Sequence, residues 1–153
     1  MGESVGSIPP RLQEIIEEFS WCEGREKLEL LLEFSEKMPP LPERIRARRD
    51  EMDQVHECMT PVSVYAEMDD NGGMGFYFDV PPESPTVRGY AAILAEGTQG
   101  ATPEAILSIP KDFYLQMGLH EVLSQQRMNG IAAILAHMKR LAVKKMHKSK
   151  ETP

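Results

Sequence analysis

The residues best suited to chemistry in this 153-residue chain surround Cys58, within the segment from Val55 to Tyr65. Cys58 stands between a charged stretch rich in arginine and acids and a run in which apolar and polar residues alternate. That position predicts a thiol at the edge of a sheet. A cysteine reacts as its thiolate, which needs an accessible sulfur and a cation nearby. Cys58 is therefore a candidate nucleophile, and a buried packing cysteine is the alternative.

Two neighbours of Cys58 have opposite expected effects on its thiol. His56 would share a face with Cys58 if the segment is extended, because side chains alternate along a strand. Glu57 is adjacent and opposes a thiolate, because a like charge disfavours the ionised form. His56 is thus a weak candidate for an activating base.

The remaining ligand-bearing side chains predict no metal site. Four histidines, at positions 56, 120, 137 and 147, and two distant cysteines show none of the closely paired spacings of zinc sites. An iron-sulfur cluster usually takes four cysteine ligands. We therefore expect neither a metal nor a bound cofactor. A protease-like arrangement of cysteine and histidine has no further support in the sequence.

A second candidate is Arg127, which has no adjacent acid to pair with and precedes the most regular helical pattern of the chain. Gly130 falls inside the apolar start of that pattern, where glycine costs about 1 kcal/mol relative to alanine. Two interpretations remain open. Arg127 is an ordinary surface residue and Gly130 permits a close helix crossing, or the guanidinium lies beside the Cys58 loop and stabilises an anionic sulfur.

Composition places limits on location and partners. With 41% hydrophobic and 27% charged residues the chain resembles an ordinary globular protein. No stretch approaches the roughly 18 to 20 apolar residues that span a bilayer, and the N-terminus lacks the pattern of a signal peptide. Two cysteines are too few for a disulfide framework and fit a reducing compartment. We expect a cytoplasmic protein, with Cys22 as a packing residue and a second redox thiol as the alternative.

The net charge of -7 is unevenly distributed. It argues against nucleic-acid binding, which depends on lysine and arginine. Residues 1–43 hold ten acids and four bases, whereas residues 137–150 hold six Lys or Arg and no acid. The basic tail suits a helix C-terminus, and partner docking is the alternative. The arginines between positions 44 and 49 form a solvated surface, or alternatively help to dock an acidic partner or hold an anionic sulfur near Cys58.

The periodicity of apolar residues predicts helices, then strands, then helices. Two short amphipathic helices come first, the earlier one capped by Ser7. A period of two from Val62, followed by a turn signal at 69–73, predicts a β-hairpin, with Thr86 and Val87 as a third strand. Helices follow at 89–96, after a cap at Thr102, and from about Ile131 to 146. The fold class is α+β, in one compact domain over residues 8–147, with flexible ends at 1–7 and 148–153.

Three segments, in this order, resemble motifs of the SufE-like sulfur acceptors. Val55 to Val64 resembles the cysteine motif of that family. Pro81 to Leu94 is similar to its V-K/R-G segment leading into a buried helix, and Leu119 to Gly130 to its L-S-P-x-R-x-N-G element. The resemblance implies a small curved antiparallel sheet of about three strands packed against helices, as in IscU-type scaffold proteins.

The resemblance also implies a function. Cys58 would accept persulfide sulfur from a SufS-type cysteine desulfurase, stimulate that enzyme, and pass sulfur to an iron-sulfur scaffold in a SufB-containing complex. By matching position, Arg127 would lie near the thiol for anion stabilisation or docking. Pyridoxal phosphate would belong to the desulfurase alone, and the chain would be an accessory protein rather than an enzyme, with no nucleic-acid or membrane partner. The alternative is a regulatory or adaptor domain that binds a desulfurase or another partner without receiving sulfur.

The chain departs from the family pattern at two positions. Glu57 occupies a position that is glycine in many members, and Gln125 replaces the usual proline of L-S-P. Both residues lie close in sequence to the candidate residues Cys58 and Arg127. They affect the expected conformation of the loop and the freedom of Cys58 to swing out.

Overall fold

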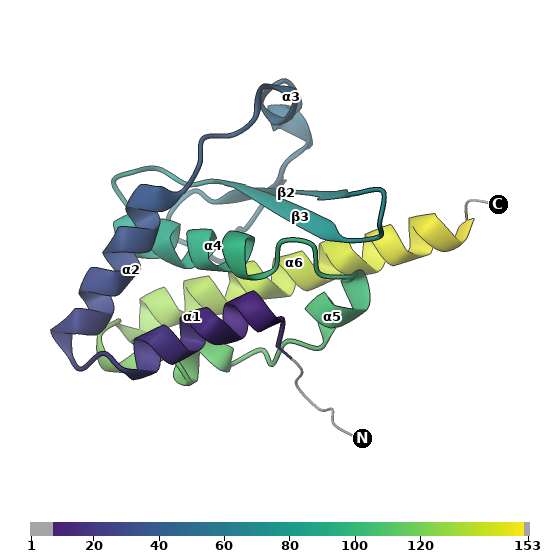
Figure 1. Ribbon diagram of the computed structural model, residues 1–153. Coiled ribbons are helices and arrows are strands. Elements are labelled where there is room, and N and C mark those ends of the chain that lie inside the picture. The colour runs from purple at the N-terminus through teal and green to yellow at the C-terminus, as the bar shows by residue number, and fades with distance from the viewer. Residues whose placement is uncertain (1–7, 152–153) are drawn as a thin grey trace, which may run out of the picture.

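Helices cover one face of a three-stranded antiparallel sheet in the computed structural model, which describes residues 8–151 (Figure 1). The helices are α1 (Pro10–Ser20), α2 (Arg25–Lys37), α3 (Glu43–Arg46), α4 (Pro85–Gly97), α5 (Pro103–Leu107) and α6 (Gln125–Glu151), with short 3-10 helices η1 (Arg49–Glu51), η2 (Phe113–Leu115) and η3 (Leu119–Glu121). The strands are β1 (Asp53–Gln54), β2 (Ser63–Met68) and β3 (Met74–Asp79). The predicted α+β class is confirmed.

The sheet has the order β1-β2-β3, and its inner face carries the predicted apolar alternation. Val64 and Ala66 of β2 pair with Phe78 and Phe76 of β3, and all four side chains are buried. The turn between these strands is closed by Asp69, whose carboxylate accepts hydrogen bonds from two backbone amides within the turn. The β-hairpin prediction is therefore confirmed.

The prediction of a third strand at Thr86 and Val87 is wrong. Both residues lie in the first turn of α4, which begins at Pro85, and a proline at the first helical position favours this start because its missing N–H needs no partner there. The third strand is β1, two polar residues that pair with the first part of β2. A strand of two polar residues is too short to show the alternation of apolar and polar residues from which strands are predicted.

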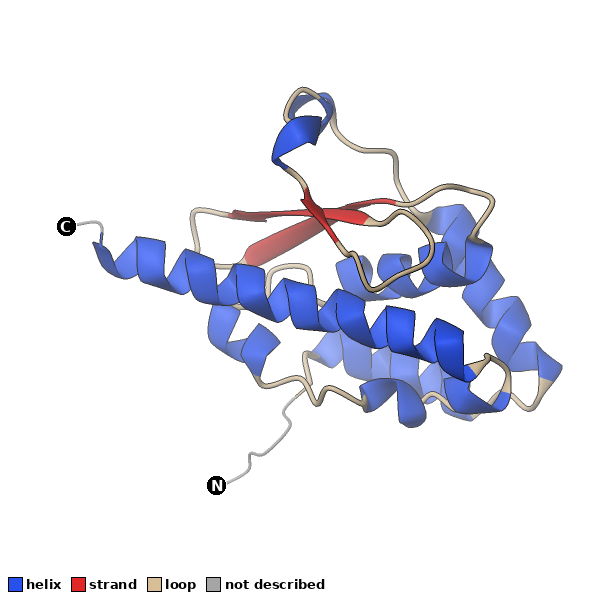
Figure 2. Cartoon of the chain, turned by 180° about the vertical axis from the view of Figure 1, so that it is seen from behind, coloured by secondary structure: helices blue, strands red, loops and turns tan. Residues whose placement is uncertain are grey.

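Helix α4 forms the centre of the domain. It packs against β3 on one side and against α1, α2 and α6 on the others, and Figures 1 and 2 show it beneath the sheet. Tyr90 of α4 is fully buried and stacks on Phe113, with 5.8 Å between the ring centroids. Gly89 lets α2 approach closely, because a Cβ at that position would lie 2.2 Å from the carbonyl oxygen of Leu31.

Gly89→Ala is expected to lower the free energy of unfolding by about 3 kcal/mol, since the added methyl group forces α2 and α4 apart and overpacking of this kind strains a well-packed core. Denaturant-induced unfolding monitored by circular dichroism measures the loss. Gly75→Ala is the control, because its Cβ would meet no atom closer than 3.5 Å. Equal stability of the two variants would contradict the tight crossing of α2 and α4.

The ends of the helices differ from the sequence prediction in part. The expected cap Ser7 lies outside the described residues, and α1 starts after Pro9. The cap at Thr102 is confirmed, because its hydroxyl accepts a hydrogen bond from the Ala105 amide. Helix α6 begins at Gln125, earlier than predicted, and its backbone continues to Glu151. Of the stretches predicted to be flexible, 1–7 and 152–153 lie outside the described residues. Among the helices described, none combines the length and apolar character needed to cross a membrane.

Candidate functional site

Cys58 lies in the loop that joins β1 to β2. The loop is closed at its base by a hydrogen bond from the Val55 amide to the Val62 carbonyl, at 2.9 Å, and both of these valines are buried. Within it, the Cys58 amide donates to the Val55 carbonyl at 3.2 Å and forms a tight turn. The backbone at His56 and Glu57 forms this turn and is not extended, so His56, which is exposed, does not share a strand face with Cys58.

The sulfur of Cys58 is half-buried against the start of α6. Its thiol donates to the backbone carbonyl of Gly130, with 3.1 Å between sulfur and oxygen. A Cβ at position 130 would lie 3.2 Å from the sulfur. Gly130 therefore does permit a close approach, but its neighbour is the Cys58 loop and not a crossing helix as predicted.

The surroundings of Cys58 favour the neutral thiol. Burial raises its pKa to about 11, and the negative charge of Glu57 acts in the same direction. The pKa of Glu57 itself is lowered, first by a hydrogen bond from a backbone amide and also by His137, whose Nε2 lies 3.5 Å from a Glu57 carboxylate oxygen. Glu57 thus stays ionised beside the sulfur, and Cys58 is protonated at neutral pH.

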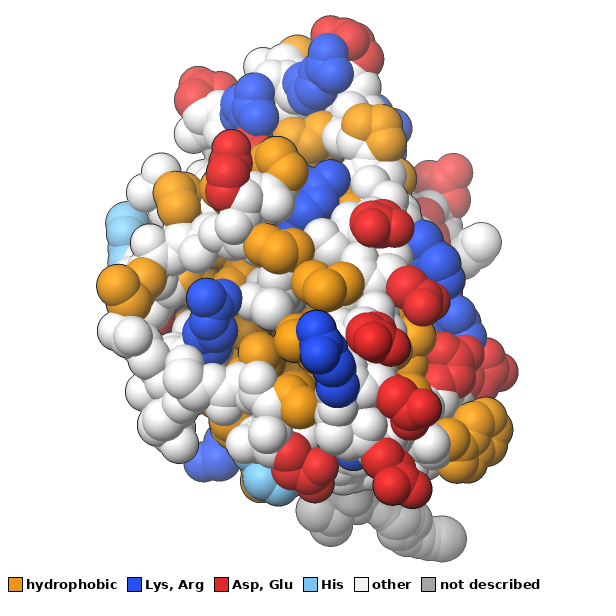
Figure 3. Space-filling model, turned by 90° about the vertical axis from the view of Figure 1, so that its left-hand side faces the viewer, with side chains coloured by type: hydrophobic (Ala, Val, Ile, Leu, Met, Phe, Trp, Pro, Cys, Tyr) orange, Lys and Arg blue, Asp and Glu red, His pale blue; other side chains and the backbone are white. Residues whose placement is uncertain are grey.

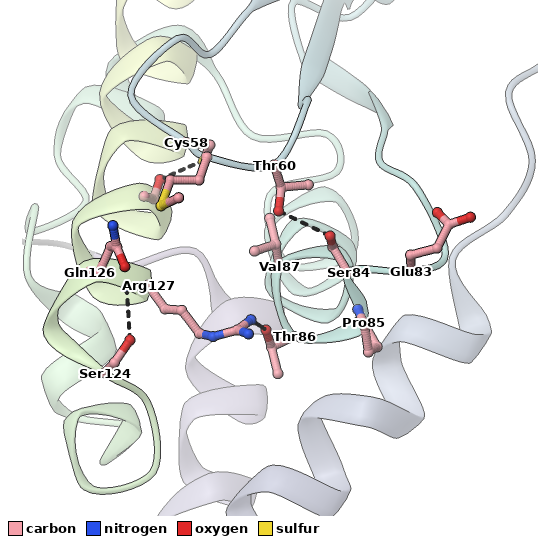
Figure 4. Close-up of a pocket in the computed structure, with 12 residues that line it drawn as sticks. Cys58, Thr60, Glu83, Ser84, Pro85, Thr86, Val87, Ser124, Gln126 and Arg127 are labelled. Atoms are coloured by element: carbon pink, nitrogen blue, oxygen red, sulfur yellow. Dashed lines mark hydrogen bonds between the residues drawn. The ribbon is translucent and has the colours of Figure 1, made fainter.

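A cavity of about 370 Å³ opens beside the sulfur, between the Cys58 loop and the first turns of α4 and α6. Hydroxyl and charged side chains contribute much of its lining (Figure 4). The lining residues are Cys58, Met59, Thr60, Glu83, Ser84, Pro85, Thr86, Val87, Ser124, Gln126, Arg127 and Gly130. The structure therefore places Cys58 and Arg127 on the walls of one cavity, although 69 positions separate them in the sequence.

Arg127 belongs to the first turn of α6 rather than to the segment before it. Its backbone amide donates to the Ser124 hydroxyl at 3.3 Å, and its guanidinium donates to the Thr86 hydroxyl at 2.8 Å (Figure 4). In this state the guanidinium is held toward α4. It is the one cationic side chain among the residues that line the cavity.

Sequence reasoning missed a second attachment of the Cys58 loop. The hydroxyls of Thr60 and Ser84 lie 3.0 Å apart, which connects the loop to the residue that precedes α4 (Figure 4). A serine directly before Pro85 is a recognisable helix-start signal. Nothing in the local sequence indicates that this serine meets Thr60.

The arginines at positions 44–49 do not line the Cys58 cavity. They belong to α3 and the residues after it, which lie over the face of the sheet opposite the other helices (Figure 1). Arg44 pairs with Glu67, and Arg49 lies 2.7 Å from Asp79. Their guanidinium groups are thus engaged by acids of β2 and β3, which supports the interpretation of a surface cluster.

Cys22 also lies apart from the cavity, between α1 and α2. Its thiol donates to the Glu18 carbonyl at 3.5 Å, and burial raises its pKa.

Within the described residues, no group of three or more histidine, cysteine or acidic side chains is arranged to hold a metal ion. The Cys58 cavity offers one thiol, one guanidinium, the carboxylate of Glu83 and several hydroxyls, and a second molecule that entered it would meet the sulfur of Cys58.

Comparison with known proteins adds independent information. The family model SufE, described as an Fe-S metabolism associated domain, matches residues 13–142. An uncharacterized SufE-like protein of Mycobacterium tuberculosis is 37% identical over 134 residues, which are 88% of this chain and 92% of that protein. A protein of Plasmodium vivax named cysteine desulfuration protein SufE is 27% identical over 86% of this chain and 52% of its own length. The solution structure of a hypothetical protein from Thermus thermophilus superposes with a TM-score of 0.80 at 36% identity, covering 92% of this chain and 98% of that one.

Proposed function

Since the chain belongs to the SufE family, we propose that Cys58 accepts persulfide sulfur from a cysteine desulfurase, stimulates that enzyme and delivers the sulfur to iron-sulfur cluster assembly. The family is one of Fe-S metabolism, and relatives within it carry the name cysteine desulfuration protein. The observation that supports the proposal best is the thiol of Cys58 on the wall of an open cavity that also contains Arg127.

The proposed reaction is an exchange between two sulfur atoms. The Cys58 thiolate attacks the outer sulfur of a persulfide on the donor, a new S–S bond forms at Cys58, and the S–S bond of the donor breaks. The donor cysteine leaves as a thiolate, which takes up a proton equivalent to the one that Cys58 lost. The outer sulfur changes carrier without net oxidation or reduction, so no further reagent is required.

The resting site needs one change before this exchange. With its pKa raised to about 11, the Cys58 thiol is a poor nucleophile at neutral pH, because the thiolate is the reactive form. Movement of the loop toward the cavity would break the hydrogen bond to the Gly130 carbonyl and relieve the burial that raises the pKa. Arg127, released from Thr86, would then offer a cation to the thiolate or persulfide.

The partners follow from the same proposal. The donor is a SufS-type cysteine desulfurase, which holds the pyridoxal phosphate, and the receiver is an iron-sulfur scaffold in a SufB-containing complex. The chain acts in the cytoplasm as an accessory to the desulfurase.

The test is the rate at which a cysteine desulfurase consumes L-cysteine with and without the chain. We expect a higher rate with it, and an unchanged rate would contradict the proposal.

Arg127→Gln is expected to lower the rate of sulfur transfer about tenfold, the size of one charge-assisted hydrogen bond of roughly 1.4 kcal/mol. The side chain is exposed, so the fold should be unchanged. Single-turnover transfer from a persulfidated desulfurase measures the effect. Arg127→Lys keeps the positive charge but not the planar guanidinium, so its transfer rate should lie between those of wild type and Arg127→Gln. A rate equal to wild type for Arg127→Gln would remove this residue from the proposed mechanism.

A further inference from the structure

A second hollow adjoins the Cys58 cavity and extends from it toward α2. Its volume is about 390 Å³, and its lining residues are Leu32, Ser35, Glu36, Pro82, Pro85 and Arg88. Pro85 also lines the Cys58 cavity, so the two hollows are neighbours that share this residue as a wall. We call this second hollow the α2 groove.

The surface of the α2 groove is largely apolar. Pro82 and Pro85 are exposed, and both are rigid side chains that offer apolar surface without needing to be ordered on binding. Arg88, the one cation that lines the groove, is already engaged, because its guanidinium donates to the carbonyls of Val80 at 2.7 Å and Ser35 at 3.3 Å. Met59, which lines the Cys58 cavity, is 80% exposed, so that cavity also offers an apolar side chain at the surface.

A row of carboxylates borders the groove along α2. Glu29, Glu33 and Glu36 share the face of the helix that carries Leu32, at spacings of three and four residues, and all three are exposed. None of them forms an ion pair with another described residue. Figure 3 shows a line of acidic side chains beside apolar ones on this face of the molecule. Arg25 and Lys37 lie four residues from Glu29 and Glu33 on the same helix, but neither forms an ion pair with the row, so the three carboxylates remain available to a cationic partner.

We propose that the α2 groove is the docking site for the sulfur donor, which contributes a lysine- or arginine-rich surface against Glu29, Glu33 and Glu36 and an apolar side chain between Leu32 and Pro85. This proposal rests on the proposed function, because it takes the donor to be the cysteine desulfurase. A protein that brings its persulfide into the Cys58 cavity covers the hollow that adjoins it at Pro85. The negative charges along α2 would accelerate and orient the approach of a basic partner surface. The sulfur exchange itself would take place in the neighbouring Cys58 cavity.

The test is direct titration of a cysteine desulfurase with the triple variant Glu29→Gln, Glu33→Gln, Glu36→Gln. We expect its Kd to rise about tenfold at low salt, since three border charges each contribute modestly, and the difference from wild type to shrink as salt screens the charges. Single-turnover transfer at saturating concentration should match wild type, because no residue of the Cys58 cavity is altered. Leu32→Ala should also weaken binding, with no dependence of its effect on salt.

The matched control removes three exposed acids that line neither hollow, in the triple variant Asp70→Asn, Glu104→Gln, Asp112→Asn. It changes the net charge by the same amount and should bind as wild type does. Equal Kd values for the two triple variants would overturn the docking proposal, as would the absence of any binding by wild type. An effect confined to delivery of sulfur from Cys58 to a scaffold would overturn it as well. Failure of the proposed function is a separate result, in which wild type binds the desulfurase but gains no sulfur.

Discussion

Cys58→Ser is expected to abolish stimulation of a cysteine desulfurase while the fold stays intact. The serine hydroxyl can still donate to the Gly130 carbonyl, which receives the thiol hydrogen bond in the wild type at 3.1 Å. The half-buried position therefore remains satisfied, and the stability should change by no more than about 1 kcal/mol. Serine has a hydroxyl in place of the thiol, so the variant cannot form the thiolate that attacks a persulfide and cannot take up sulfur. The measurements are the rate of L-cysteine consumption and the midpoint of thermal unfolding.

Cys22→Ser is the matched control for this loss. Cys22 lies between α1 and α2, outside the Cys58 cavity, so its replacement should leave the stimulation unchanged. If Cys58→Ser stimulated the enzyme as well as wild type, sulfur transfer through this residue would be ruled out. The chain would then be an adaptor that works by binding alone.

The second large effect is slow reaction of Cys58 with iodoacetamide in the free protein. Burial raises the pKa from 9.0 to about 11, so the thiolate fraction at pH 7.5 falls about 100-fold relative to an unburied thiol. A more basic thiolate is intrinsically more nucleophilic, which raises the alkylation rate about tenfold and offsets part of this loss. We therefore expect alkylation at least about tenfold slower than in the unfolded chain.

The pH dependence gives the sign of this effect. A raised pKa means that the rate constant should still increase steeply between pH 9 and 10, where an ordinary thiol levels off. The experiment uses Cys22→Ser, so that only Cys58 reports, and repeats the profile in denaturant as the reference. Gly130→Ala should move the profile toward lower pH, because the added methyl would lie 3.2 Å from the sulfur and displace it. A plateau at or below pH 9 in the folded protein would contradict the buried thiol.

Local patterns predicted the regular parts of the fold. Alternation from Val62 and the acidic turn at 69–73 identify β2 and β3, because side chains on a half-buried strand repeat with a period of two. Strand β1 has only two polar residues, and it is a strand because β2 offers it a free edge. Thr86 and Val87 have strand-like side chains, but Pro85 before them starts a helix and determines their conformation.

The candidate site could be predicted only in part. The order of three motifs pointed to Cys58 and Arg127 together, yet their roles stay predictions. The contacts that define the resting state join distant positions: Cys58 to Gly130 across 72 residues, and Arg127 to Thr86 across 41. Helical and strand periodicities act over a few residues and carry no information on such pairs. The raised pKa of Cys58 follows from this packing and is likewise absent from the local sequence.

The most direct measurement of the central claim is the intact mass of the chain after incubation with a cysteine desulfurase and L-cysteine. We expect the mass of one added sulfur atom, located on Cys58 by peptide mapping, removed by a thiol reductant, retained in Cys22→Ser and absent in Cys58→Ser. An unchanged mass in the presence of a desulfurase that is turning over L-cysteine would contradict the proposal that this protein is a sulfur acceptor.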